Sequence, residues 1–146
     1  MKPEWILIAN ATRARLLQRQ RGEPMVVLES FVHPEGRLKI SELADDRLGH
    51  EAVDSSYGGA SFQPRTDAKR KEHERFAREL AQHLERQAQL DHFHSLTIFA
   101  SSPFLGEIKA QLGAATTRLL SGAHDLDLTS VGLAELERRI AHELAH

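Results

Sequence analysis

The stretch Trp5-Ile6-Leu7-Ile8-Ala9 is apolar throughout and rich in residues that favour β-structure. A short apolar run without alternation predicts a strand that is buried on both of its faces. Leu96-Thr97-Ile98-Phe99-Ala100 predicts a second apolar strand. Because a doubly buried strand needs helices on both sides of its sheet, the pattern favours an α/β fold.

Two further segments extend the sheet from the first strand. Residues 13–17 alternate between polar and apolar side chains, as a half-buried strand does, and residues 25–33 predict a third strand. The turns near residues 10–12 and 22–24 are too short for crossover connections. We therefore expect the first three strands to form an antiparallel meander.

A long helix is predicted over residues 67–90, where apolar side chains recur every four residues from Phe76 to Leu84. Thr66 or Asp67 is expected to cap its first turn, because both side chains accept hydrogen bonds from orphan amides. Lys69, Arg70 and Lys71 would then lie near the helix start, where they oppose the helix dipole, and an anion would relieve that cost.

The second half of the chain predicts two more helices and a last strand. Ser102 followed by Pro103 begins a helix, with the serine as N-cap. Residues 119–120 or 126–128 supply the strand, and residues 129–130 begin the final helix. The order β-β-β-loop-α-β-α-β-α predicts one α/β domain over residues 1–146, with a mixed sheet flanked by helices.

Composition excludes several classes of protein. The chain has 146 residues, which suits one domain, and its lack of cysteine excludes disulfides, thiolate zinc sites and a cysteine nucleophile. It fits a reducing, cytoplasmic setting. No apolar run predicts a membrane span or a signal peptide. The net charge of −2 argues against bulk attachment to nucleic acid, and no DNA partner is expected.

The charge is unevenly distributed, however. Residues 65–78 carry a net charge of +3 within an otherwise slightly acidic chain. Residues 34–64 show no clear period beyond a helical turn near residues 38–43, and we expect a long mobile loop over about residues 44–64. Gly58 and Gly59 would bring exposed amides close to a phosphate or RNA beside the basic helix. A solvated helix face and a loop without a ligand remain the alternatives.

Two further motifs carry less weight. His142, Glu143 and His146 match the spacing H-E-x-x-H, in which two imidazoles bind zinc and the glutamate acts as a base. The same spacing arises by chance in a chain with nine histidines, and a terminal turn frays, so we expect no metal and no cofactor. His92 and His94 flank Phe93 and are expected to be structural.

The sequence resembles the bacterial family described as proteins required for attachment to host cells, the host attachment family. Its most specific motif is Gln63-Pro64-Arg65-Thr66-Asp67. The further segments that carry the resemblance are residues 5–15, 33–39, 42–49, 74–80, 103–106 and 126–129. The family name describes a phenotype and implies no particular chemistry.

That family is similar to the middle domain of archaeo-eukaryotic release factors and of Pelota, which implies a ribonuclease-H-like fold. In release factors a Gly-Gly-Gln loop before a basic helix promotes hydrolysis of peptidyl-tRNA. Gly58 and Gly59 match that place, but Ala60 replaces the glutamine, and Gln63 follows three residues later. A backbone amide survives this change, whereas the side-chain amide does not.

The leading interpretation is therefore a non-catalytic cytoplasmic protein that contacts RNA, with the ribosome or tRNA as partner. The alternatives are a peptidyl-tRNA or ester hydrolase that uses the Gly58-Gly59 loop, a zinc hydrolase, and an attachment or protein-interaction module. A homo-oligomer is compatible with each. The residues expected to contact RNA or another ligand are Arg47, Gly58, Gly59, Ser61, Arg65, Lys69, Arg70, Lys71 and Arg75.

Overall fold

A computed structural model of the chain describes residues 2–33 and 58–145, and over residues 58–66 it describes the backbone alone. The elements are β1 (Glu4–Ala9), β2 (Arg13–Arg19), β3 (Val26–Val32), α2 (Gly58–Gln89), β4 (Ser95–Ala100), α3 (Phe104–Gln111), α4 (Ala114–Leu119), β5 (Leu120–Asp125) and α5 (Leu133–Leu144). The expected turn near residues 38–43, and the expected loop up to residue 57, lie outside the described residues.

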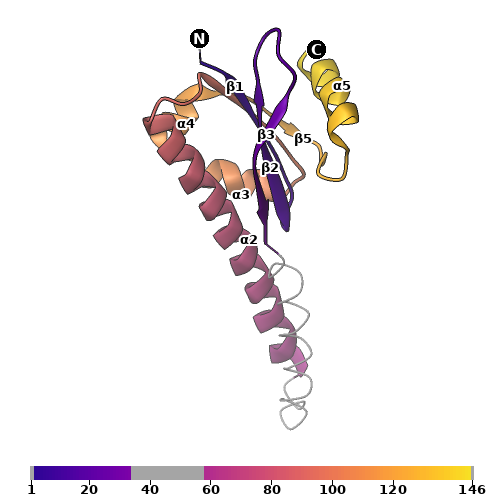
Figure 1. The fold of residues 1–146 in the computed structure, drawn as a ribbon. Coiled ribbons are helices and arrows are strands. Elements are labelled where there is room, and N and C mark those ends of the chain that lie inside the picture. Colours follow the sequence, from indigo (N-terminus) through magenta and orange to yellow (C-terminus); the bar gives the residue numbers. More distant parts are fainter. Residues whose placement is uncertain (1, 34–57, 146) are drawn as a thin grey trace.

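The strands form one five-stranded sheet in the order β3-β2-β1-β4-β5 (Figure 1). β1 pairs antiparallel with β2, and β2 pairs antiparallel with β3, which confirms the predicted meander. β4 lies parallel to β1 and to β5, so the sheet is mixed as expected. The two apolar runs of the sequence are therefore neighbours at the centre of the sheet.

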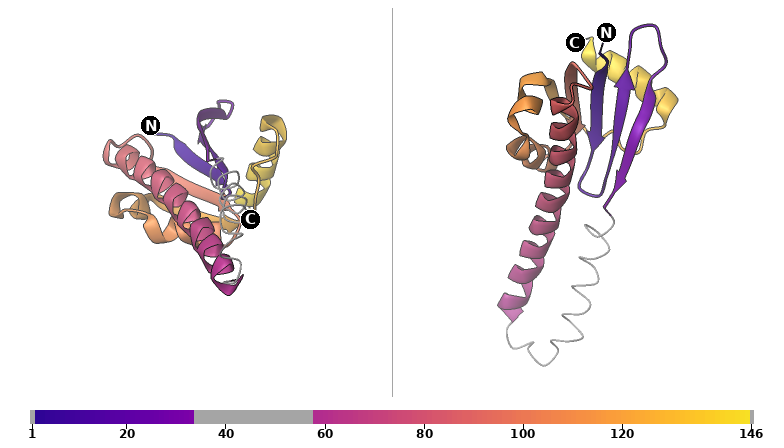
Figure 2. Two further views of the ribbon diagram at one scale, coloured as in Figure 1. Left: turned by 90° about the horizontal axis from the view of Figure 1, so that it is seen from below. Right: turned by 60° about the vertical axis from the view of Figure 1, so that its left-hand side comes forward.

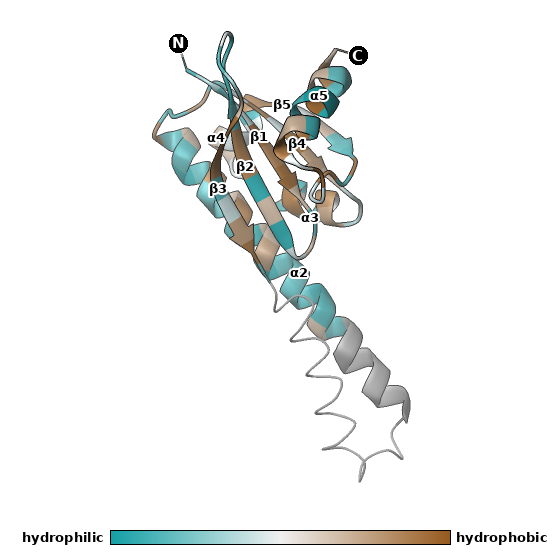
Figure 3. Cartoon of the chain, turned by 45° about the vertical axis from the view of Figure 1, so that its right-hand side comes forward, coloured by the Kyte–Doolittle hydropathy of each residue, from teal (hydrophilic) through white to brown (hydrophobic). Residues whose placement is uncertain are grey.

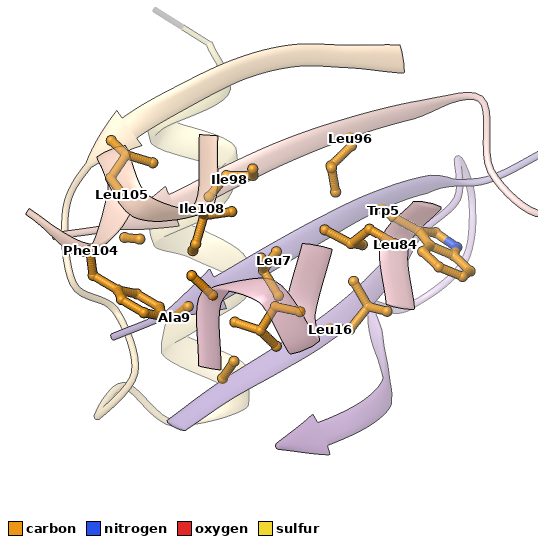
Figure 4. Close-up of a cluster of buried hydrophobic side chains, with 14 of the residues drawn as sticks. Trp5, Leu7, Ala9, Leu16, Leu84, Leu96, Ile98, Phe104, Leu105 and Ile108 are labelled. Atoms are coloured by element: carbon orange, nitrogen blue, oxygen red, sulfur yellow. The ribbon is translucent and has the colours of Figure 1, made fainter. Parts of the chain in front are cut away.

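One face of the sheet is covered by α2 and α3. Leu7, Leu16 and Ile98 rise from the sheet to meet Leu84 and Ile108, and all five are nearly inaccessible to water (Figure 4). Trp5 stacks on Phe93 at the edge of this cluster, with 4.6 Å between the ring centroids. Burial of large apolar side chains on this scale is the main stabilising contribution to the fold.

The other face is covered by α5 (Figure 2). Ile6 and Ile8 alternate with the residues that face α2, and they pack with Phe99 beneath Leu136 and Ile140. Side chains on neighbouring strand positions point to opposite faces, so the unbroken apolar run of β1 serves both cores. The prediction that β1 is buried on both faces is confirmed.

α2 is much longer than the sheet beside it. Its 32 residues extend about 48 Å, whereas strands of six or seven residues extend about 20 Å. The buried residues of α2 begin at Glu72 and Phe76, so the helix leaves the sheet near that point. Its N-terminal part runs past the carboxyl ends of β1, β4 and β5 (Figures 1 and 2).

The start of α2 corrects the sequence-based prediction. The helix begins at Gly58 instead of near Asp67, so residues 58–64 are helical and do not form a loop. Two glycines and Pro64 have low helix propensity, which is why local pattern predicted a break. Extension of an existing helix is cooperative and adds one hydrogen bond per residue, so neighbouring turns override such local preferences. Asp67 forms an ion pair with Arg70 and caps nothing.

The predicted N-caps in the second half of the chain are also wrong. α3 begins after Pro103, and the Ser102 hydroxyl donates to Asp125 Oδ2 at 2.9 Å. α5 begins after Gly132, whereas Thr129 donates from its hydroxyl to Asp127 Oδ1. In each case the hydroxyl binds a charged carboxylate, from β5 or from the loop after it, instead of a backbone amide of the helix. The sequence does not show that this carboxylate lies nearby.

α4 was not predicted, and a residue of α2 holds its first turn. Glu85 accepts hydrogen bonds from the backbone amide of Thr116 at 3.0 Å and from that of Ala115 at 3.2 Å. These bonds, above all the one from the Thr116 amide, lower the pKa of Glu85 below its ordinary value. Gly113 leaves room for the carboxylate, because a Cβ there would lie 2.4 Å from Glu85 Cδ.

Candidate functional site

The part of α2 that extends beyond the sheet carries most of the sequence-predicted site residues. From Gly58 to Lys71 it spans about 20 Å, and no described side chain before Glu72 is buried. Figure 3 shows this part as mainly hydrophilic where its side chains are described, in contrast to the hydrophobic β4. The helix therefore presents a polar rod at the carboxyl end of the sheet.

Five cations lie exposed on α2, three of them on this rod and two on the turns that follow it. They are Lys69, Arg70, Lys71, Arg75 and Arg78. Lys71, Arg75 and Arg78 follow the spacing i, i+4, i+7, so they share one helix face and form a row about 10 Å long. Like charges at this spacing cost an isolated helix about 0.2–0.5 kcal/mol per pair. Helix stability thus does not explain the row.

Acidic neighbours neutralise part of this charge. Arg70 pairs with Asp67 at 3.4 Å, and Arg75 pairs with Glu72 at 3.1 Å. No ion pair with another described side chain engages Lys71 or Arg78. Exposed pairs such as Arg70 with Asp67 contribute little energy and exchange readily with other anions. The row therefore keeps cations that are available to a partner.

A buried imidazole–carboxylate pair fixes the position of this row. His33, directly after β3, donates from Nε2 to Glu72 Oε2 at 3.0 Å, and Glu72 Oε1 accepts from Arg75 at 3.1 Å. His33 and Glu72 are only 9% and 5% exposed. The His33 ring also stacks on Phe76, 4.9 Å away. Arg75 is thus held through Glu72 by the core of the protein.

A second imidazole lies on the other side of the same turn. His73 meets Phe104 edge to face, with 6.4 Å between ring centroids. Burial, and next the nearby charge of Lys69, lower the pKa of His73. His73 is therefore neutral near pH 7, and the positive charge of this surface comes from lysine and arginine.

α/β proteins often bind ligands at the carboxyl ends of their parallel strands. Here the polar side chains at those ends form a cluster in which they hydrogen-bond to one another. Asn10 donates to Asp127 at 3.2 Å and to Thr129 at 3.0 Å, and its own Oδ1 accepts from the amide of Thr12. Burial alone would raise the pKa of Asp127, but the hydrogen bonds from Thr129 and Asn10 outweigh it and the pKa is lowered. The cluster holds the turn after β1.

The remaining predicted residues are placed as follows. Gly58 and Gly59 begin α2, in the turn whose amides lack partners within the helix. They lie about 16 Å along the helix from Lys69, so glycines and cations form one line and not one compact site. Ala60, Ser61, Gln63 and Arg65 belong to the same helix, but their side chains lie outside the description. Arg47 also lies outside it.

This placement removes the dipole argument for an anion. Lys69, Arg70 and Lys71 come three turns after the helix start, and the field of the helix end falls off within its first turn. Arg78 is the residue that the prediction missed. Its spacing of seven from Lys71 was visible in the sequence, and it extends the exposed row.

The histidine motifs gain no support as metal ligands. His142 is exposed in the last turn of α5 and Glu143 is half-buried, while His146 lies outside the description. His92 bonds Gln87, and His94 donates to the Lys2 carbonyl at 2.7 Å. Within residues 2–33 and 67–145, no group of three histidine or acidic side chains is arranged to hold a metal. In the same segments, no helix is both long and apolar enough to cross a bilayer.

Comparison with known protein families gives a match over most of the chain. The model of a family described as "Protein required for attachment to host cells" matches residues 5–140. No curated protein matches the chain. The family match covers the sheet, the helices on both of its faces and the basic row of α2.

Proposed function

The chain belongs to the family of proteins required for attachment to host cells, and from that premise we propose that it contacts RNA through the basic part of α2. The contact is non-catalytic, and the ribosome or a tRNA is the partner. The attachment phenotype of the family is then an indirect effect of this contact. The exposed row of Lys71, Arg75 and Arg78 is the observation that carries the proposal.

The shape of the molecule supports this proposal. α2 projects beyond the sheet at Lys71 and the residues before it, so the cations at this end of the row can enter a groove or a cleft that the body of the protein cannot enter (Figure 2). Arginine and lysine bind phosphate through charge-assisted hydrogen bonds, and arginine does so with two parallel donors. A row on a rigid helix presents these donors at fixed spacing without the entropy cost of ordering a loop.

The fold supports a more distant relationship as well. We propose that the domain is ribonuclease-H-like, as in the middle domain of release factors and Pelota. A single mixed five-stranded sheet with helices on both faces is compatible with this. The place of Gly58 and Gly59 before the basic row matches the order of the release-factor motif.

The test is co-sedimentation of the full chain with ribosomes, with fluorescence anisotropy on tRNA as a second readout. The test variant combines Lys71→Glu, Arg75→Glu and Arg78→Glu. The control combines Arg86→Glu, Lys109→Glu and Arg118→Glu, which changes the net charge equally at exposed sites elsewhere. We expect the test variant to lose binding and the control to keep most of it.

The salt dependence of RNA binding tests how many phosphate contacts the row makes. Binding through phosphate contacts weakens as salt rises, with a slope that falls by about one for each contact removed. We therefore expect the single substitution Arg78→Gln to reduce the slope by about one. Equal loss of binding in the test and control variants, or no binding by the native chain, would refute the proposal. Circular dichroism of each variant verifies that α2 is intact.

A further inference from the structure

A second candidate site lies at the opposite end of the molecule from the basic row. An open pocket of about 630 Å³ forms where β1 and β4 begin, β2 turns into β3 and α5 ends. Figure 1 shows both termini and the β2–β3 turn at this end, away from the start of α2. Pockets that hold small molecules typically measure about 300–1,000 Å³.

The pocket exists because α5 covers only part of its face of the sheet. Ile6 and Phe99 lie beneath α5, and the rows of side chains continue past its end. The strand register places Glu4 opposite Arg19 and places Thr97 opposite Gly122, all on this same face. These four residues line the pocket. Its floor is therefore the uncovered end of the sheet.

The floor contains a hydroxyl without a protein partner. Thr97 is 1% exposed, and among the described residues no hydrogen bond engages its side chain. The one buried side-chain nitrogen or oxygen without a partner among the described residues is Trp5 Nε1, so the Thr97 hydroxyl is open to the space of the pocket. Thr97 lines the pocket, so a bound molecule can supply the missing partner.

The wall beside Thr97 carries loosely held positive charge. Arg19 forms an ion pair with Glu4 in which Nη1 and Oε1 are 3.8 Å apart, beyond the length of a good hydrogen bond. Arg21 lies exposed on the rim. A guanidinium in this state can exchange its weak contact for a bidentate bond to an oxyanion.

Two features limit the ligand. The His124 ring lies flat on Phe99, with 4.7 Å between centroids, so it forms a fixed flat wall. Glu4 and Glu23 add negative charge to the same lining, which repels highly charged anions. The pocket chemistry therefore suits a small molecule with one oxyanion.

From the unpartnered hydroxyl of Thr97, the loose pairing of Arg19 and the volume beside them, we propose that this pocket binds a small molecule through a single phosphate or carboxylate group. Arg19 binds the oxyanion, and Thr97 donates to one of its oxygens. The site is separate from the basic row of α2 and does not depend on RNA binding.

The experiment is an NMR titration of the full, isotope-labelled chain with inorganic phosphate, acetate and pyrophosphate as separate probes. We expect saturable shifts at the amides of Arg19, Thr97 and Gly122 with phosphate or acetate. Phosphate-specific shifts identify a phosphate ligand, and acetate-specific shifts identify a carboxylate. Tighter binding of pyrophosphate than of either would refute the single-oxyanion assignment.

Variants separate this pocket from other anion sites. Thr97→Val and Arg19→Gln preserve the strands, and each is expected to weaken binding about tenfold. Gly122→Val fills the pocket, since a Cβ there meets only the His124 ring at 3.6 Å, and it should abolish the shifts. Arg118→Gln, an exposed residue of α4, is the control that keeps them. Unchanged titrations in Thr97→Val and Arg19→Gln, or shifts confined to α2, would refute the proposal.

Discussion

Glu85 shows how one side chain links two elements that are distant in the sequence. It leaves α2, passes over Gly113 and accepts hydrogen bonds from the amides of Ala115 and Thr116 in the first turn of α4. The sequence offers only an unremarkable glutamate on a predicted helix. A side-chain cap from a residue 30 positions away depends on the packing of α2 against α4, which no local pattern records.

Loss of this carboxylate should destabilise the protein in a pH-dependent way. Its folded pKa is lowered below the ordinary value of 4.5, so its contribution is present above that value and disappears as pH falls through the folded pKa. We expect Glu85→Gln to lower the free energy of unfolding by about 1–2 kcal/mol at neutral pH and by less in acid. Urea unfolding near pH 7 and near pH 3 measures both values.

The exposed Glu79 on the same helix provides the control. Glu79→Gln should change stability by less than about 0.5 kcal/mol, because surface substitutions without such contacts are nearly neutral. An equal effect of the two substitutions at neutral pH would contradict the capping role of Glu85.

Gly113 should be coupled to Glu85. A Cβ at Gly113 would lie 2.4 Å from Glu85 Cδ, so Gly113→Ala displaces the carboxylate and removes the cap. We expect this substitution to cost about 1–2 kcal/mol in the native chain and much less when Glu85 is already alanine. A double-mutant cycle by urea unfolding measures the coupling. Additive costs would show that the glycine has another role.

At the scale of single elements, β3 depends on α2. β3 is an edge strand with exposed Val26, Val27 and Leu28, so it buries little apolar surface of its own. Two histidine–glutamate pairs tie it to α2, one from His33 to Glu72 and one from Glu29 to His83 at 2.9 Å. The sequence predicts the strand but not its attachment.

Breaking the first pair should loosen β3 selectively. His33→Ala leaves Glu72 buried with Arg75 as its remaining partner, and unpaired burial of a charge is costly. We expect amide hydrogen exchange in β3 to accelerate at least about tenfold while β1 stays protected. His92→Ala, at an exposed histidine, is the control. Uniform acceleration in β1 and β3 would mean that His33 supports the whole domain instead.

The local sequence pattern predicts the buried face of α2 but not its first residue. The four-residue spacing from Phe76 to Leu84 predicted its buried stripe correctly. The predicted start lies near Asp67, because the glycine and proline residues before it disfavour helix. As a result, the cations were assigned to a helix start, whereas they lie in its middle and form a row.

At the scale of the whole molecule, the sheet separates two cores. α2 and α3 cover one face and α5 covers the other, so a side chain in one core is shielded from the second by the strands (Figure 2). Both cores share β1 and β4, whose residues alternate between them. We therefore expect one cooperative unfolding transition for the entire domain.

Cavities in the two cores should act additively. Leu84→Ala and Ile140→Ala lie on opposite faces of the sheet, and each should lower the free energy of unfolding by about 2–5 kcal/mol. The double variant should equal the sum within about 0.5 kcal/mol, because residues without shared partners rarely couple. The fluorescence of Trp5, the single tryptophan, reports the transition. Two separate transitions would show that α5 unfolds independently.

The sequence alone determined the class of fold, because the alternation of side chains along a strand and the period of a helix are local properties. Trp5 to Ala9 indicated a doubly buried strand, and Phe76 to Leu84 indicated the helix that covers it. Tertiary structure alone decided where α2 leaves the sheet, which carboxylates hold α4 and Ser102, and where α5 leaves a pocket. Each of these depends on residues that are distant in the sequence and close in space, where packing and hydrogen bonding outweigh local propensity.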